Sequence, residues 1–153
     1  MWSELINNNI LIAPLLCWAV AQLCKVILFL VKEKRVNFRY LLSGGGMPSS
    51  HSALVAGLAT ALALVEGVGS AAFGVSIVLA FIVMYDAATV RHSVGQQAAV
   101  LNRVIKEIQE RKPVKVLGRE LKELIGHSPL QVFVGGSLGV GIAWLWVANV
   151  VVD

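Results

Sequence analysis

A short polar segment rich in glycine separates two strongly apolar stretches in the first half of the chain. It consists of Ser43-Gly44-Gly45-Gly46-Met47-Pro48-Ser49-Ser50-His51-Ser52. Three consecutive glycines allow the backbone to turn and to approach a ligand closely. Pro48 and the serines after it are typical of a helix start, where free N–H groups and the helix dipole favour an anion. The imidazole of His51 would lie beside this anion site, which indicates acid–base chemistry on a phosphate.

A second set of polar residues lies near the ends of other apolar stretches. Its members are Lys25, Lys32, Arg39, Asp86, Arg91, His92, His127 and Ser128. Lys25 lies about two turns inside an apolar stretch, where a charge is costly and is usually partnered or functional. Ser128 followed by Pro129 predicts a helix N-cap, so His127 also lies at a helix start. Two histidines, two helix N-termini and several cations could meet in one pocket that fits a phosphate monoester or a diphosphate.

The composition places the elements that carry these residues in a membrane. The 153 residues are 57% hydrophobic and 14% charged, and the mean hydropathy is +0.75, which is unlike a soluble domain. Four apolar stretches predict transmembrane helices of a single membrane domain over residues 1–153: roughly 10–31, 49–65, 69–88 and 129–152. The second is short at roughly 25 Å, so it spans only if the bilayer thins or the glycine loop dips inward. We expect an all-α membrane helical bundle with about four transmembrane segments.

The positions of the basic residues predict how this bundle is oriented. All 13 Lys and Arg residues fall in or near the first and third connections between the apolar stretches. By the positive-inside rule these two connections are cytoplasmic. We therefore expect a multi-pass protein of the inner (plasma) membrane with both termini outside and the pocket facing the cytoplasm. Basic residues that follow membrane topology also disfavour a nucleic-acid partner.

The third connection, residues 91–126, has the pattern of an amphipathic helix. Ala98, Leu101 and Ile108 share one face, and Pro113 ends the helix. It is either a soluble helical hairpin or an interfacial helix that lies on anionic lipid and covers the pocket, and we favour the interfacial interpretation. Glycines in the last apolar stretch predict close helix packing, within one subunit or in a homo-oligomer. They are Gly135, Gly136, Gly139 and Gly141.

Three segments resemble motifs of the divergent bacterial and plant branch of the type 2 phosphatidic acid phosphatases, the superfamily that includes acid phosphatases and vanadium-dependent haloperoxidases. They are Gly45-Gly46-Met47-Pro48-Ser49-Ser50-His51-Ser52, Tyr85-Asp86-Ala87-Ala88-Thr89-Val90-Arg91, and Gly126-His127-Ser128-Pro129-Leu130-Gln131-Val132. The resemblance runs from Gln22 to about Gly141. It implies a membrane enzyme that hydrolyses a lipid phosphate or diphosphate through a phosphohistidine intermediate, with no metal or other cofactor.

The resemblance also implies roles for individual residues. His127 matches the histidine that attacks phosphorus, and His51 matches the histidine that protonates the leaving oxygen. Arg91 matches the arginine that binds the phosphoryl oxygens. Further residues expected to hold the phosphate are Arg39, Ser49, Ser50 and Gly46, together with one of two lysines, Lys32 or Lys25.

Three positions depart from the pattern of that family. Tyr40 stands in place of a proline, and Ser50 in place of a glycine, where its hydroxyl could bind phosphate. Gln131 replaces an aspartate that normally orients the nucleophilic histidine and stabilises its positive charge. A glutamine can accept a hydrogen bond from the ring but supplies no charge. Asp86 could take over that duty, or it could pair with Arg91 or Lys25.

Two other functions fit some of the same residues. A lipid-phosphate binder or transporter that retains the pocket without turnover is the alternative that Gln131 favours. A metal site built from His51, Asp86 and His127 has less support, because the sequence contains no closely spaced ligand pair. The sequence leaves open which lipid phosphate is bound.

Overall fold

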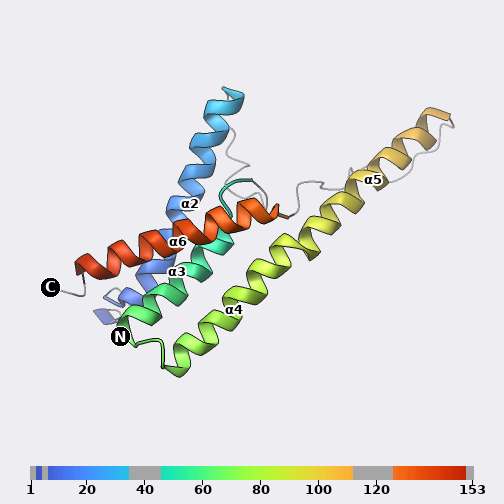
Figure 1. The fold of residues 1–153 in the computed structure, drawn as a ribbon. Coiled ribbons are helices and arrows are strands. Elements are labelled where there is room, and N and C mark those ends of the chain that lie inside the picture. Colours follow the sequence, from blue (N-terminus) through green and yellow to red (C-terminus); the bar gives the residue numbers. More distant parts are fainter. Residues whose placement is uncertain (1–2, 5–6, 35–45, 112–125, 151–153) are drawn as a thin grey trace.

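The computed structural model describes residues 3–4, 7–34, 46–111 and 126–150, and these ranges contain helices and no strand. In chain order the helices are α2 (Asn9–Glu33), α3 (Ser50–Val65), α4 (Ala71–Ala88), α5 (Val90–Arg111) and α6 (Pro129–Val150). Figure 1 shows α2, α3, α4 and α6 gathered in a bundle. The predicted all-α class is confirmed.

Three helical segments are long and apolar enough to cross a membrane. They are Asn9–Val31, Ala71–Ile108 and Pro129–Val150. The 16 residues of α3 make a helix of about 24 Å at the usual rise per residue, which is shorter than a hydrocarbon core of about 30 Å. The chain is therefore an all-α membrane helical bundle with one short apolar helix among its members.

Serine and asparagine side chains fix where the helices begin. The Ser49 hydroxyl accepts a hydrogen bond from the N–H of Ser52, and the Ser70 hydroxyl accepts one from Phe73. Asn8 caps α2 in the same way. Ser49 is thus the N-cap of α3, and Pro48 precedes this cap. The predicted N-cap at Ser128 is confirmed, because α6 begins at Pro129 and the Ser128 hydroxyl accepts a hydrogen bond from the N–H of Gln131.

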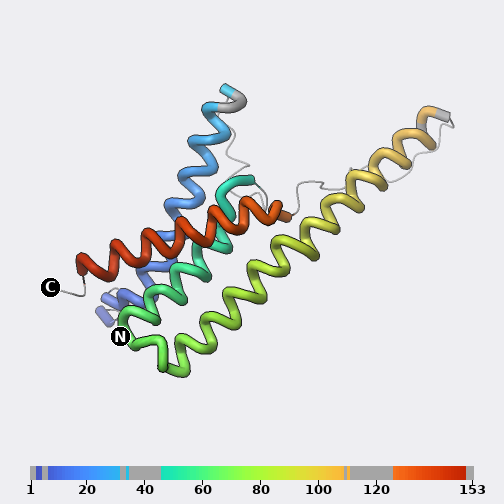
Figure 2. The backbone as a smooth tube through the Cα atoms, in the orientation of Figure 1, coloured from blue at the N-terminus to red at the C-terminus, as the bar shows by residue number. Residues whose placement is uncertain are grey.

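The short helix α3 lies at the centre of the bundle and packs against α2, α4 and α6, as the tube in Figure 2 shows. Small residues make these contacts close. A Cβ on Gly139 would overlap the backbone of Ala53, and a Cβ on Gly135 would overlap the backbone of Ser49. The predicted close packing therefore occurs within one subunit at these two glycines, while a Cβ on Gly141 would meet nothing within 4 Å.

Helix α5 continues α4 almost in a straight line and extends beyond the bundle (Figure 1). The helical hydrogen bonds run on through Thr89, whose N–H donates to the carbonyl of Tyr85 at 2.9 Å and whose carbonyl accepts from Ser93 at 2.9 Å. The expectation that this helix lies across the pocket is therefore wrong for Val90–Arg111. The rest of that connection, with Pro113, lies outside the described residues.

Three of the helix ends that carry polar residues meet at one end of the bundle. The starts of α3 and α6 and the end of α4 lie together there, whereas the start of α2 and the end of α6 lie at the opposite end (Figure 1). This arrangement brings residues that are far apart in the sequence into a single site.

Candidate active site

A cavity of about 160 Å³ lies where α3 and α6 begin and α4 ends. It is lined by His51, Ile82, Val83, Asp86, Ala87, Arg91 and His127. The expected meeting of both histidines with Arg91 and Asp86 is therefore present in the fold. The walls from α4 also include the apolar residues Ile82 and Val83, which the sequence patterns do not single out.

Gly126 fixes His127 against the junction of α4 and α5. The N–H of His127 donates to the carbonyl of Ala87 at 3.1 Å. Gly126 has a φ of +119°, and a Cβ there would overlap the backbone of Arg91 and His92. Only glycine fits both the conformation and the space. Gly126 belongs to the third segment of the sequence motif without an expected role of its own, although a glycine two residues before an N-cap is a signal for such a turn.

The hydrogen bonds of Gln131 define which ring nitrogen of His127 carries the proton. Nδ1 of His127 lies 3.3 Å from Oε1 of Gln131, and the backbone N–H of Ser128 donates to the same oxygen at 3.1 Å. Because a backbone N–H can only donate, the atom facing it is the amide oxygen, which can only accept. Nδ1 therefore carries the hydrogen, and Nε2 has the free lone pair.

The Nε2 atom of His127 is buried and has no hydrogen-bond partner among the described residues. The His127 side chain is 1% exposed. Burial lowers the pKa of His127, and the positive charges of Lys25 and His51 lower it further. The hydrogen bond with Gln131 and the backbone of Gly46 act in the opposite direction and raise this pKa. The net direction is down, so the ring is neutral at pH 7. A neutral imidazole with an unused Nε2 lone pair is a competent nucleophile.

Lys25 brings a buried positive charge to the same end of the bundle. Its side chain is 4% exposed, and Nζ donates to the hydroxyl of Ser50, itself 1% exposed, at 3.3 Å. Among the described residues, no carboxylate lies within ion-pair distance of Lys25. A buried ammonium is costly unless an anion compensates it. Of the two rival lysines, Lys25 is placed at this end of the bundle by its contact with Ser50, and the side chain of Lys32 lies outside the described residues.

The other predicted phosphate ligands divide into three groups. Gly46 has a φ of +96°, and a Cβ there would lie 4.0 Å from Cδ of Lys25, so this glycine lies beside the lysine stem. The hydroxyl of Ser49 is occupied by Ser52, whose O–H lies 2.9 Å away, and Ser49 N–H donates to the carbonyl of Gln131 at 3.1 Å. Ser49 therefore joins α3 to α6 and does not line the cavity. Arg39 lies outside the described residues.

Asp86 pairs with Arg91 at the mouth of the cavity. Nε of Arg91 and Oδ2 of Asp86 are 2.6 Å apart, and the two side chains are 56% and 38% exposed. Of the two duties considered for Asp86, pairing with Arg91 is the one observed, and Gln131 is the residue that orients His127. An exposed ion pair stabilises by only about 0–1 kcal/mol, so an incoming anion can compete with Asp86 for the guanidinium.

The third histidine and the metal alternative are separate from this arrangement. Nε2 of His92 lies 3.2 Å from Nε2 of Gln96 on α5, and His92 does not line the cavity. No group of three or more His, Cys, Asp or Glu side chains within the described ranges is placed to hold a metal ion. The cavity thus combines two imidazoles and the guanidinium of Arg91 around a space for an anion, and the ammonium of Lys25 lies at the same end of the bundle.

Two comparisons relate this chain to known proteins. Residues 6–142 match the Divergent PAP2 family. The chain is also 38% identical over 146 residues to "Uncharacterized membrane protein YuiD" of Bacillus subtilis (strain 168), and the match covers 90% of this chain and 92% of that protein. No solved structure matches. Together with its helical membrane fold, these matches show that the chain belongs to the Divergent PAP2 family.

Proposed function

We propose that the chain is a membrane phosphatase that hydrolyses a lipid phosphate or diphosphate through a phosphohistidine on His127. The observation that carries this proposal is the hydrogen-bonded tautomer of His127. Gln131 Oε1 holds the Nδ1 proton at 3.3 Å, so the buried Nε2 keeps its lone pair and lacks a partner among the described residues. Membership in the Divergent PAP2 family supports the same reaction.

In this proposal, the phosphate supplies the counter-ion that Lys25 lacks among the described residues. Lys25 has two N–H donors besides the one directed at Ser50, and Arg91 can exchange Asp86 for a phosphoryl oxygen. Fixed positive charge around the equatorial oxygens is the main requirement of phosphoryl transfer. The proposal assigns substrate binding to Lys25, Arg91 and Ser50.

The proposed reaction has two steps. In the first, Nε2 of His127 attacks phosphorus and the bond from phosphorus to the ester oxygen breaks. His51, which the negative charge of the bound phosphate keeps protonated, gives its proton to the leaving oxygen. In the second, neutral His51 takes a proton from water as that water attacks phosphorus, and the P–N bond breaks. Inorganic phosphate leaves, His127 regains its Nε2 lone pair, and His51 is protonated again.

The amide of Gln131 also favours the second candidate, a lipid-phosphate binder or transporter. A neutral amide orients the ring of His127 but adds no negative charge to stabilise the ring while it carries the phosphoryl group. A site with this change can retain phosphate binding while its turnover is slow or absent. Measurements of binding and of phosphate release therefore separate the two candidates.

We further propose that the site faces the cytoplasm of a multi-pass plasma-membrane protein. The basic residues are concentrated in the connections at the site end of the chain's apolar stretches, and such residues remain on the cytoplasmic side during insertion. The ends of the bundle support the same orientation, since α2 starts and α6 finishes at the end opposite the site (Figure 1).

The test is phosphate release by the detergent-purified protein from a panel of lipid monophosphates and diphosphates. We expect release by the wild type, loss of release in His127→Ala, and normal release in His92→Ala. The second variant is a matched control, because it removes a histidine that does not line the cavity. Equal release by His127→Ala would contradict the proposal. Headgroup binding without release from any substrate would favour the binder.

A further inference from the structure

The cavity that would receive a phosphate has a carboxylate in its wall. Asp86 lines this cavity together with His51, Arg91 and His127. A negative charge at this position repels an incoming anion. The two steps of the proposed reaction use the histidines and the cations, and Gln131 rather than Asp86 orients the ring of His127. Both steps therefore leave this carboxylate without a role.

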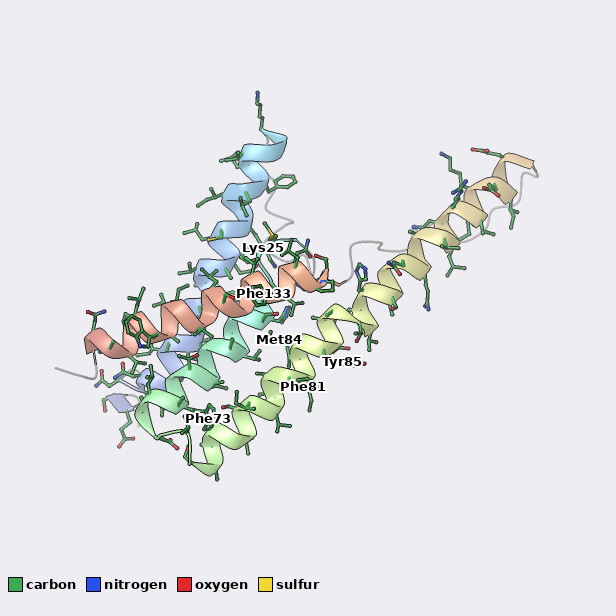
Figure 3. All side chains as sticks on the ribbon, in the orientation of Figure 1. Lys25, Phe73, Phe81, Met84, Tyr85 and Phe133 are labelled. Carbon is green, nitrogen blue, oxygen red and sulfur yellow. The ribbon has the colours of Figure 1, made fainter. Side chains whose placement is uncertain are left out.

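Asp86 is held close to Arg91 by the continuous helical run on which both residues lie. Figure 3 shows Met84 turned toward the bundle and Tyr85 turned away from it, and Asp86 follows them in the last turn of α4. Oδ2 of Asp86 accepts a hydrogen bond from Nε of Arg91, five residues later, at 2.6 Å. The backbone is fixed here, because the carbonyl of Ala87 accepts a hydrogen bond at 3.1 Å from the N–H of the residue two before α6. Exchange of Asp86 for another anion on Arg91 therefore requires only rotation of side chains.

A carboxylate tethered in this way competes with any free anion for the guanidinium. Because Asp86 and Arg91 are little more than one helix turn apart, the effective concentration of the carboxylate is on the order of millimolar or higher. The side chains are 38% and 56% exposed, so both can rotate and a displaced carboxylate can be hydrated. Inorganic phosphate, the product of the second step, carries the negative charge that Lys25 and Arg91 attract. Without a competitor this product would leave slowly, and slow product release commonly limits turnover.

We propose that Asp86 competes with phosphate for Arg91 and so drives the release of inorganic phosphate after hydrolysis. The inference rests on the proposed function and assigns a residue to its release step. As phosphate leaves, Oδ2 of Asp86 returns to Nε of Arg91. This is an exchange of ion pairs, in which no covalent bond forms or breaks and no proton is transferred. The same competition weakens binding of the substrate phosphate, so Asp86 lowers the affinity for substrate and product alike.

Calorimetric titration of the detergent-purified protein with inorganic phosphate tests this competition without turnover. Asp86→Asn keeps a side-chain oxygen that can accept from Arg91 and removes the negative charge. We expect the Kd for phosphate to fall about tenfold in this variant, because the ion pair no longer has to be broken and the repulsion is gone. Asp86→Ser also removes the charge and should tighten binding as well, so the test stands if one of the two variants fails to fold.

Glu107→Gln is the matched control for the loss of a charge. It removes the carboxylate of another arginine pair, in which Nε of Arg103 and Oε1 of Glu107 are 3.4 Å apart, and neither residue lines the cavity. We expect this variant to bind phosphate like the wild type. If Asp86 served instead to position Arg91, Asp86→Asn would bind phosphate more weakly. Weaker or unchanged binding in Asp86→Asn would therefore overturn the inference.

An Arg91→Met background shows whether the competition is for the guanidinium. In this background Asp86 has no guanidinium to return to, so the added Asp86→Asn change should tighten phosphate binding only about threefold or less. A tenfold gain in both backgrounds would show repulsion throughout the cavity and would overturn the assignment to Arg91.

Steady-state kinetics with a lipid phosphate separates this inference from the proposed function. Asp86→Asn should lower kcat and KM together and lower the inhibition constant of inorganic phosphate about tenfold. An unchanged kcat despite tighter phosphate binding would overturn the role in release. Phosphate release by the wild type, with the same Kd in Asp86→Asn, would disprove the competition and leave the phosphatase proposal intact. Tighter binding in Asp86→Asn without release by the wild type from any substrate would support the competition and favour the binder over the enzyme.

Discussion

Replacing Gln131 by glutamate tests how His127 is held in its reactive form. Glutamate has the length of glutamine, so its carboxylate can keep both contacts, 3.3 Å to Nδ1 of His127 and 3.1 Å to the N–H of Ser128. Aspartate is one methylene shorter and cannot reach both atoms without a backbone shift. Gln131→Glu therefore adds a negative charge beside the ring while it leaves the geometry unchanged.

The added charge should raise the pKa of His127. In the wild type, burial lowers this pKa, so Nε2 is free at neutral pH and becomes protonated only in acid. A carboxylate in contact with a cation typically shifts a pKa by about one to three pH units in favour of the charged form. In Gln131→Glu, Nε2 is thus protonated at higher pH, and the acid limb of kcat/KM should move upward by about one to three pH units.

The assay is the pH dependence of kcat/KM for phosphate release by the wild type, Gln131→Glu and Gln96→Glu. The last variant is the matched control, because Gln96 lies 3.2 Å from the ring of His92, outside the cavity. We expect its profile to match the wild type. An acid limb that stays in place in Gln131→Glu, or that moves equally in both variants, would refute the assignment of His127 and Gln131.

Three further predictions follow from the packing and the charges. Lys25→Met keeps the buried stem and removes the ammonium, so KM for the phosphate substrate should rise by about tenfold or more, equivalent to about 1.4 kcal/mol; an unchanged KM would exclude Lys25 from phosphate binding. Gly139→Ala places a methyl group on the neighbouring backbone and should destabilise the fold by about 1–3 kcal/mol. The control Gly141→Ala points into open space, so a thermal midpoint in detergent that falls equally in both variants would contradict the packing. The orientation is tested in a protein whose native cysteines have been replaced. There Val68→Cys should react with an impermeant thiol reagent in intact cells, and Gln96→Cys should not. The reverse labelling pattern would show the opposite orientation.

The positions of the helices could be predicted because their signals are local. Apolar runs, the serine at position 49 and the Ser128–Pro129 pair define the starts of α3 and α6 within a few residues. The direction of α5 could not be predicted in this way. Thr89 is a poor helix former, yet the helical hydrogen bonds continue through it, and the amphipathic pattern beyond it fits a surface helix as well as a projecting one.

The site was predictable where its contacts lie within one helix turn. Gln131 follows His127 by four residues at a helix start, so their hydrogen bond follows from the spacing. The contact between Lys25 and Ser50 joins two helices, and it depends on how α2 is rotated against α3 where Cys17 meets Gly57. Such a rotation results from three-dimensional packing, which a sequence pattern does not specify.

The most direct test of the phosphatase mechanism is to trap the phosphorylated protein. The purified chain is mixed with a lipid phosphate that carries a radiolabelled phosphoryl group, quenched in base and digested for mass spectrometry. We predict one modified residue, His127, with phosphorus on Nε2 and a linkage that is stable in base and lost in acid; His92→Ala should give the same product and His127→Ala none. A phosphorylated residue other than His127, or steady release of phosphate by a protein that never carries the label, would contradict the phosphohistidine mechanism.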